Sequence, residues 1–214
     1  MTPQTLWQQI IFDKMPHGTL VEAMRKAVAD LEILAQRPFY MSHIQVKLIP
    51  FEDLRTFDDS LLAAGIFLHM SDDLPGWTVF TLPVTRACLF VDWLLEKPRG
   101  TTCDFDPLAC SVLAEMGNVL LASFLSQIAQ FTGTSIRPSP PSVVVDKMSN
   151  ILEVSSASLT IITDELLVIE TDIKSAEEDL QIHAWILPDR FAFQFDREEI
   201  EEQSRELAVI SNGK

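Results

Sequence analysis

Basic residues, glycine and paired cysteines are scarce in this chain of 214 residues. Only 16 Lys and Arg stand against 31 Asp and Glu, which gives a formal net charge of −15. A surface this acidic repels phosphate backbones and anionic membranes, so we expect no nucleic acid as a partner and no membrane insertion. With 7 glycines and 47% apolar residues, the composition excludes fibrous and disordered chains and indicates a folded globular protein.

The 3 cysteines, Cys88, Cys103 and Cys110, form no C-x-x-C pair and have no histidines at ligand spacing. Neither a zinc site nor a disulfide framework is predicted, and reduced, mostly buried thiols are the simpler interpretation. The N-terminus lacks the basic start and apolar core of a signal peptide, and no apolar run reaches about 18 residues. We therefore expect a soluble, cytoplasmic protein.

Helical and strand-like segments follow one another in an order that occurs twice. Periodicity, turn residues and capping residues predict helices over 4–15, 19–37, 84–96 and 107–131, and strands over 44–48, 63–70, 77–82, 143–145, 166–171 and 180–187. Glu22 and Glu115 take equivalent places in the two long helices, 93 residues apart. This recurrence indicates a duplicated half-domain.

Two such halves that share one sheet predict an α+β fold with about six mostly antiparallel strands. The halves cover about 17–100 and 104–190, and the two long helices should lie side by side on one face of the sheet. We expect a single domain over 1–200. A flexible tail is expected over 201–214, where an acidic run leads into polar residues.

The helix over 107–131 has the strongest start signal in the sequence, because Asp106 can cap it and Pro107 suits its first position. One broad face of this helix is apolar. A narrow opposite stripe consists of Ser111, Glu115, Asn118 and Ala122. If the stripe contacts a partner, it must be exposed to solvent in the free protein.

This helix and the segment after it resemble the CheC, CheX and FliY phosphatases. Their signature is Asp or Ser, three residues, Glu, two residues, Asn, 22 residues and Pro, and it is matched here by Ser111, Glu115, Asn118 and Pro141. Residues 115–120 are similar to the family's E-x-G-N-I-L run, and residues 138–146 to its S-P-P-x-V-V-x-D segment. The resemblance is clear over about 105–190 and weak before it.

The resemblance implies a hydrolase that removes the phosphoryl group from the aspartyl-phosphate of a CheY-type response regulator, in chemotaxis or a related two-component signalling pathway. Glu115 and Asn118 would be the catalytic residues: Asn118 would orient the attacking water and Glu115 would dock on a lysine of the receiver. The partner-binding residues would be Ser111, Gly117, Ala122 and Pro141. The chain would need no cofactor of its own, and Mg²⁺ would be bound by the receiver.

Physical chemistry agrees with these residue types. A neutral carboxamide can accept a hydrogen bond from water without bringing negative charge toward a phosphoryl group. Gly117 in the middle of a helix costs about 1 kcal/mol relative to alanine, which indicates close packing or close approach of another group. Pro141 fixes the backbone at the start of the next strand.

The first long helix departs from the signature. Alignment of Glu22 with Glu115 places Gly18 at the Asp or Ser position and Arg25 at the Asn position. Arginine has only donors, so it cannot accept a hydrogen bond from an attacking water, and we expect one working site. The alternative is a non-catalytic protein that binds a phosphorylated receiver or a CheD-type deamidase; the retained Glu115 and Asn118 favour the enzyme.

Overall fold

The computed structural model describes residues 3–12, 18–50, 53, 62–157, 165–189 and 197–212. The helices are α1 (Pro3–Ile11), α2 (Thr19–Ala35), α3 (Val84–Leu94), α4 (Pro107–Thr132), α5 (Met148–Ala157) and α6 (Arg197–Asn212). The strands are β1 (Phe39–Pro50), β2 (Leu62–Asp72), β3 (Gly76–Pro83), β4 (Ile136–Pro138), β5 (Ser142–Lys147), β6 (Glu165–Ser175) and β7 (Gln181–Pro188). The predicted α+β class is confirmed. The predicted helix over 4–15 is described only as far as residue 12.

All strand pairs of the 7-stranded sheet are antiparallel, in the order β1-β6-β7-β3-β2. β4 and β5 both pair with β2 and form one interrupted edge. Pro140 and Pro141 lie at the interruption, where missing N–H groups prevent a continuous ladder. With β5 at the β2 edge, the strand order reads the same from both ends when β1 is matched with β5, β6 with β2, and β7 with β3. The sheet therefore has the pseudo-two-fold arrangement expected of two halves.

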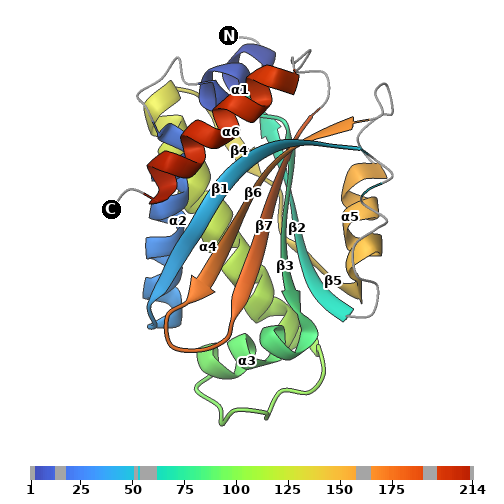
Figure 1. Cartoon of the computed structure of the whole chain (residues 1–214). Helices are drawn as coiled ribbons and strands as arrows, with labels where there is room; N and C mark the ends of the chain where they lie inside the picture. The colour runs from blue at the N-terminus through green and yellow to red at the C-terminus, as the bar shows by residue number, and fades with distance from the viewer. Residues whose placement is uncertain are drawn as a thin grey trace.

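The two long helices cover one face of the sheet and run side by side in opposite directions (Figure 1). At their crossing the Ser123 hydroxyl donates to Asp30 Oδ2, and these positions are separated by the 93 residues of the proposed repeat. The crossing therefore lies on the pseudo-two-fold axis. Hydrogen bonds from Lys26 and then from Ser123 hold the pKa of Asp30 below its usual value.

By length and composition alone α4 could cross a membrane. Its apolar character has a different cause in the fold, because it packs against α2, α3 and the sheet. The residues buried in these contacts are Ala109, Leu113, Met116, Gly117, Leu120, Leu121, Phe124, Leu125 and Ile128. They follow helical spacing, and all of them except Gly117 belong to the main hydrophobic core.

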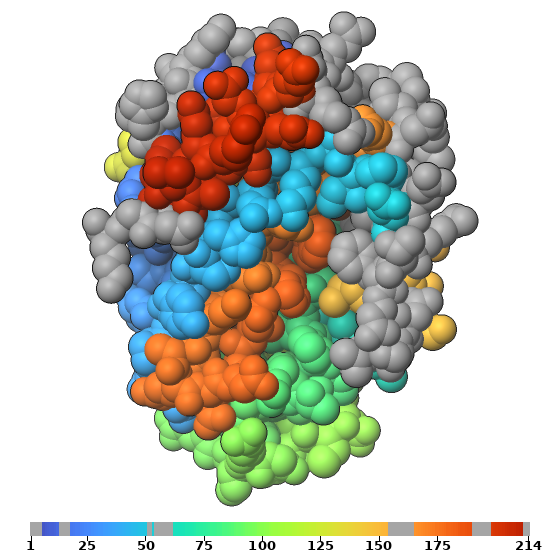
Figure 2. Space-filling model, viewed as in Figure 1, coloured from blue at the N-terminus to red at the C-terminus, as the bar shows by residue number. Residues whose placement is uncertain are grey.

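The opposite face of the sheet is not covered by the long helices, and in Figure 2 the side chains of β1, β6, β7 and β3 form its surface. A second apolar cluster on this face includes Phe67, Val168 and Trp185, and it packs against Ile151 of α5. The sequence did not predict α5 or the short strand β4. β4 has only 3 residues, too few to show a period, and α5 follows β5 directly, with no segment between them to mark its start.

α6 corrects the expectation of a flexible tail over 201–214. Residues 201–212 belong to this helix, which packs along β1 and reaches α2. Ile200, Gln203 and Leu207 are buried at helical spacing, while the acidic side chains between them are exposed. The acidic run is therefore the solvent side of an amphipathic helix.

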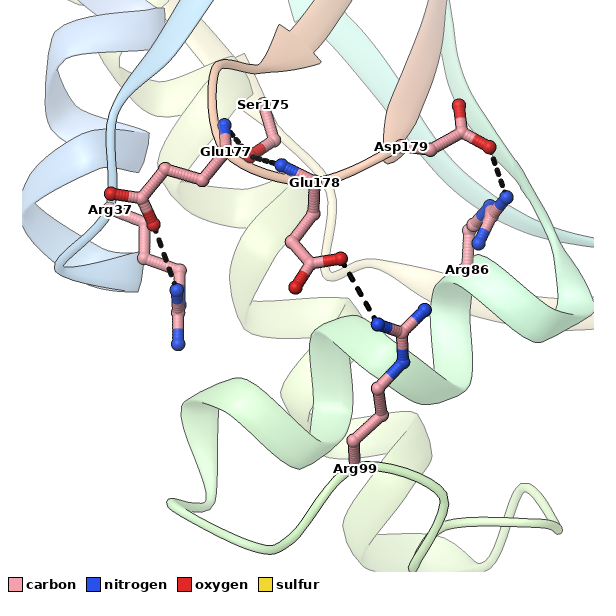
Figure 3. A network of polar contacts seen from close by, with 7 residues as sticks. All are labelled: Arg37, Arg86, Arg99, Ser175, Glu177, Glu178 and Asp179. Atoms are coloured by element: carbon pink, nitrogen blue, oxygen red, sulfur yellow. Dashed lines mark hydrogen bonds and ion pairs between the residues drawn. The ribbon is translucent and has the colours of Figure 1, made fainter.

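The turn between β6 and β7 is held by three arginines from different elements (Figure 3). Glu177 pairs with Arg37 at 2.9 Å. Glu178 pairs with Arg99 at 3.2 Å, and Asp179 pairs with Arg86. These pairs are at the surface, where each contributes at most about 1 kcal/mol. Together they connect the hairpin to α3, to the segment between α3 and α4, and to the segment between α2 and β1.

A buried carboxylate anchors the loop that leads from α3 to α4. Asp92 is fully buried and accepts hydrogen bonds from the backbone N–H groups of Gly100 (2.7 Å), Thr101 (3.1 Å) and Thr102 (2.8 Å). Burial alone would raise the pKa of Asp92, but the hydrogen bonds from Thr102, Gly100 and Thr101 outweigh it and lower the pKa. The anchor fixes the approach to the N-terminus of α4.

We predict that Asp92→Asn lowers the free energy of unfolding by about 2 kcal/mol, since charge-assisted hydrogen bonds are lost. For a chain of this size the melting temperature should fall by about 4–8 °C. Asp104→Asn, an exposed change in the same loop, is the matched control and should have little effect. An equal loss in both variants would contradict the anchoring role.

The pH dependence gives a second test of the same anchor. Because the pKa of Asp92 is lowered by folding, its stabilisation is complete above the unfolded value of about 4 and is lost as the pH falls through the folded pKa. Denaturant titrations measure the difference in free energy of unfolding between the unmodified protein and Asp92→Asn. This difference should be constant above about pH 5 and should shrink below about pH 4. A difference that grows in acid would contradict a pKa of Asp92 that is lowered by folding.

Candidate functional site

The N-terminus of α4 is built as its sequence predicts. Asp106 is the N-cap and its Oδ1 accepts from the Ala109 backbone N–H at 2.7 Å, with Pro107 at the first helical position. Gly133 ends the helix in the left-handed conformation, with φ of 68°. This frame orients the stripe of α4 that the sequence singled out.

The stripe lies on the outside of the molecule. Ser111, Glu115 and Ala122 are exposed, and Asn118 is partly exposed. Glu115 and Asn118 are three residues apart and therefore neighbours on the helix surface. The Ser111 hydroxyl donates to the Pro107 carbonyl at 2.7 Å, so it is already engaged within the helix.

Glu115 and Asn118 have no side-chain hydrogen bond or ion pair within the part of the chain that the structure describes. The Asn118 carboxamide can thus offer its oxygen as an acceptor and its nitrogen as a donor to an incoming group. The Glu115 carboxylate can accept from a cationic donor. Together they form what we call the uncommitted pair: two polar side chains on one helix that have no hydrogen-bond partner among the described residues.

Gly117 is buried and faces the sheet, away from the stripe. A Cβ at this position would come to 2.6 Å from Ile66 Cγ2 of β2, well inside van der Waals contact. Close packing of α4 on β2 therefore accounts for the glycine. It lies beneath the site and sets the height of the helix above the sheet.

Pro141 is partly buried and directly precedes β5. Two residues on, Val143 is paired with Ile66, the side chain that lies under Gly117. The segment before Pro141 is fixed to β2 by the Ser139 hydroxyl, which accepts from the His69 backbone N–H at 2.9 Å. The helix and the proline of the signature are thus both positioned on β2.

The equivalent stripe of α2 is partly covered by the chain itself. Arg25 Nη1 donates to Glu22 Oε1 at 2.8 Å, and Arg25 Nη2 donates to the Ile210 carbonyl of α6 at 3.3 Å. Gly18 has φ of 94°, and a Cβ there would lie 3.3 Å from Ile210 Cγ2. The last turn of α6 therefore lies against the positions that correspond to Ser111 and Asn118.

A second polar group lies on the open face of the sheet. Asp172 and His183 pair at 2.6 Å beside a cavity of about 260 Å³ that His43, Glu170 and Trp185 also line. Burial would raise the pKa of Asp172, but the His183 hydrogen bond and charge lower it. Among the described residues, no cluster of three or more His, Cys, Asp or Glu side chains could hold a metal ion.

Comparisons with known proteins give a consistent picture. Residues 108–145 match the family described as CheC-like. The chain is 30% identical over 158 residues to the CheY-P phosphatase CheC of Bacillus subtilis (strain 168), a match that covers 68% of this chain and 76% of that protein.

Solved structures share the fold at low sequence identity. Thermotoga maritima FliY has a TM-score of 0.64 at 14% identity, with 98% of each chain covered. The CheX–CheY–BeF3–Mg²⁺ complex of Borrelia burgdorferi has a TM-score of 0.50 at 14% identity, with 79% of this chain and 97% of the matched chain covered.

We predict that Gly117→Ala destabilises the protein, although alanine is the better helix former. The added methyl would overlap Ile66 of β2, and overpacking of this kind costs about 1–3 kcal/mol. Ser126→Ala, an exposed change on the same helix, should be neutral or slightly stabilising. Thermal denaturation of the two variants checks this, and a stabilised Gly117→Ala would contradict the packing described.

Proposed function

The chain belongs to the CheC-like family, and from this premise we propose that it dephosphorylates the aspartyl-phosphate of a CheY-type response regulator. The observation that carries the proposal is the uncommitted pair of Glu115 and Asn118 on the outer stripe of α4. A relative that is a CheY-P phosphatase supports the reaction, and the CheX–CheY complex supports the kind of partner.

Asn118 positions the attacking water. Its amide oxygen accepts a hydrogen bond from the water, whose oxygen attacks phosphorus in line with the aspartyl oxygen. As the new P–O bond forms, the bond from phosphorus to the aspartyl oxygen breaks, and the products are inorganic phosphate and the free carboxylate. A carboxylate in place of Asn118 would be repelled by the phosphoryl oxygens.

Glu115 docks the helix on the partner. It lies one turn before Asn118, and its carboxylate pairs with a lysine of the receiver. Ser111, Ala122 and Pro141 border the contact, while Gly117 supports the helix from beneath. The chain supplies no cofactor in this scheme; the receiver would hold Mg²⁺, which would supply neutralising charge at the phosphoryl oxygens.

One receiver binds to each chain. The α2 stripe presents Arg25 where α4 presents Asn118, and α6 lies against the same positions. A receiver that approached α2 would have to displace the last turn of α6. The α4 stripe has no such cover among the described residues.

We predict that Asn118→Ala lowers kcat for phosphate release from a phosphorylated receiver by about 10²-fold, because the water loses its orientation. Binding to the beryllofluoride-activated receiver should remain nearly unchanged, since the lost contact acts mainly in the transition state. Glu115→Ala should weaken binding as well as turnover. Steady-state phosphate release and titration calorimetry measure the two effects.

Glu22→Ala, the equivalent exposed position on α2, is the matched control and should leave binding and turnover unchanged. The Glu115 contribution to affinity should shrink at high salt if its lysine pair is solvent-exposed. Undiminished turnover in Asn118→Ala would contradict the mechanism. Tight binding without turnover in the unmodified protein would favour a non-catalytic adaptor.

We further predict a stoichiometry of one activated receiver per chain, measured by light scattering of the complex after size-exclusion chromatography. Arg25→Asn should not raise it, because α6 still lies against Gly18. Two receivers per chain in the unmodified protein would contradict the assignment of α2 as a closed site.

A further inference from the structure

Leu108 is an exposed apolar side chain that borders the stripe of α4 on the side of Glu115. It is 50% exposed, whereas the neighbouring Ala109 is 2% exposed. Seven residues separate Leu108 from Glu115, which places them about 20° apart around the helix and about 10 Å apart along it. Ser111 lies between them on the exposed side.

The fold does not need a leucine at this position. Leu108 is in the first turn of α4, where Asp106 supplies the cap and Ala109 and Leu113 supply the buried contacts. The first turn of a helix generally favours polar or acidic residues. Half of the Leu108 side chain is therefore exposed to water, and the packed core does not include it.

The leucine is also presented on a rigid frame. The loop before α4 is fixed by three backbone hydrogen bonds to the buried Asp92. The N-cap bond of 2.7 Å then fixes the first turn. A contact residue held in this way loses little conformational entropy when a partner binds.

We propose that Leu108 is an apolar anchor for the receiver that docks on α4, a role that rests on the function proposed above. A standard interface buries about 800 Å² on each partner, which corresponds to a radius of roughly 16 Å around Glu115. Leu108 lies well inside that footprint. The receiver face that meets it must carry an apolar depression next to the lysine that pairs with Glu115.

The anchor acts on affinity and leaves chemistry unchanged, because Leu108 lies about 15 Å along the helix from Asn118. Truncation of an interface leucine that becomes buried should weaken binding roughly tenfold. The Kd and the KM should rise together, and kcat should stay constant.

The test uses the full chain and a CheY-type receiver activated with beryllofluoride and Mg²⁺, for Kd, and the phosphorylated receiver, for kinetics. Leu108→Ala should raise Kd and KM roughly tenfold at unchanged kcat. Leu108→Met, which keeps the apolar bulk, should bind nearly as tightly as the unmodified protein. Val209→Ala, at a side chain 73% exposed on α6, is the matched control and should change nothing.

If the unmodified protein binds and dephosphorylates the receiver but Leu108→Ala has the same Kd, the anchor role of Leu108 is wrong and the phosphatase function still holds. A fall in kcat at constant Kd would also overturn the anchor role, because the residue would then act on the chemistry. If the unmodified protein neither binds nor dephosphorylates any receiver, the proposed function fails and the anchor fails with it. Thermal denaturation of each variant confirms that the fold is retained.

Discussion

The close approach of α4 to β2 at Gly117 determines how the site is presented. A side chain at this position would overlap Ile66, so only glycine lets the helix lie this close to the sheet. Because one face of α4 is committed to that contact, the opposite stripe must face outward. The exposure of Glu115 is thus a consequence of packing, and Pro141 is fixed on the same strand through Val143 and its pairing with Ile66.

The two halves of the molecule have the same framework and different surfaces. Asp30 and Ser123 meet at the crossing of α2 and α4, which shows that the helices are related by the pseudo-two-fold. On the α4 side, the polar pair is open to a partner. On the α2 side, Arg25 is bonded at the surface to Glu22 and to the last turn of α6. The two halves of the duplicated fold thus present different polar groups at equivalent positions.

The sequence predicts most of this framework because the signals are local. Asp106 and Pro107 mark the start of α4, and the apolar period of α2 and α4 gives their buried faces. α6 could not be identified in the same way, since its acidic residues are as numerous as its apolar ones and its partners on β1 are distant in sequence. The spacing of Ile200, Leu207 and Ile210 is the sequence feature that could have indicated a buried side. The contact of Ile210 with Gly18 depends on tertiary packing and has no sequence signal.

The most direct test of a catalytic rather than a binding role is the rate at which a phosphorylated CheY-type receiver loses its phosphoryl group. This protein is present at a molar ratio of about 1:10 to the receiver. An enzyme that orients water through Asn118 turns over many times, so the whole receiver population should lose its phosphoryl group faster than it does alone. The same amount of Asn118→Ala should leave the decay close to the spontaneous rate. Spontaneous decay with the unmodified protein, despite binding to the activated receiver, would contradict the account.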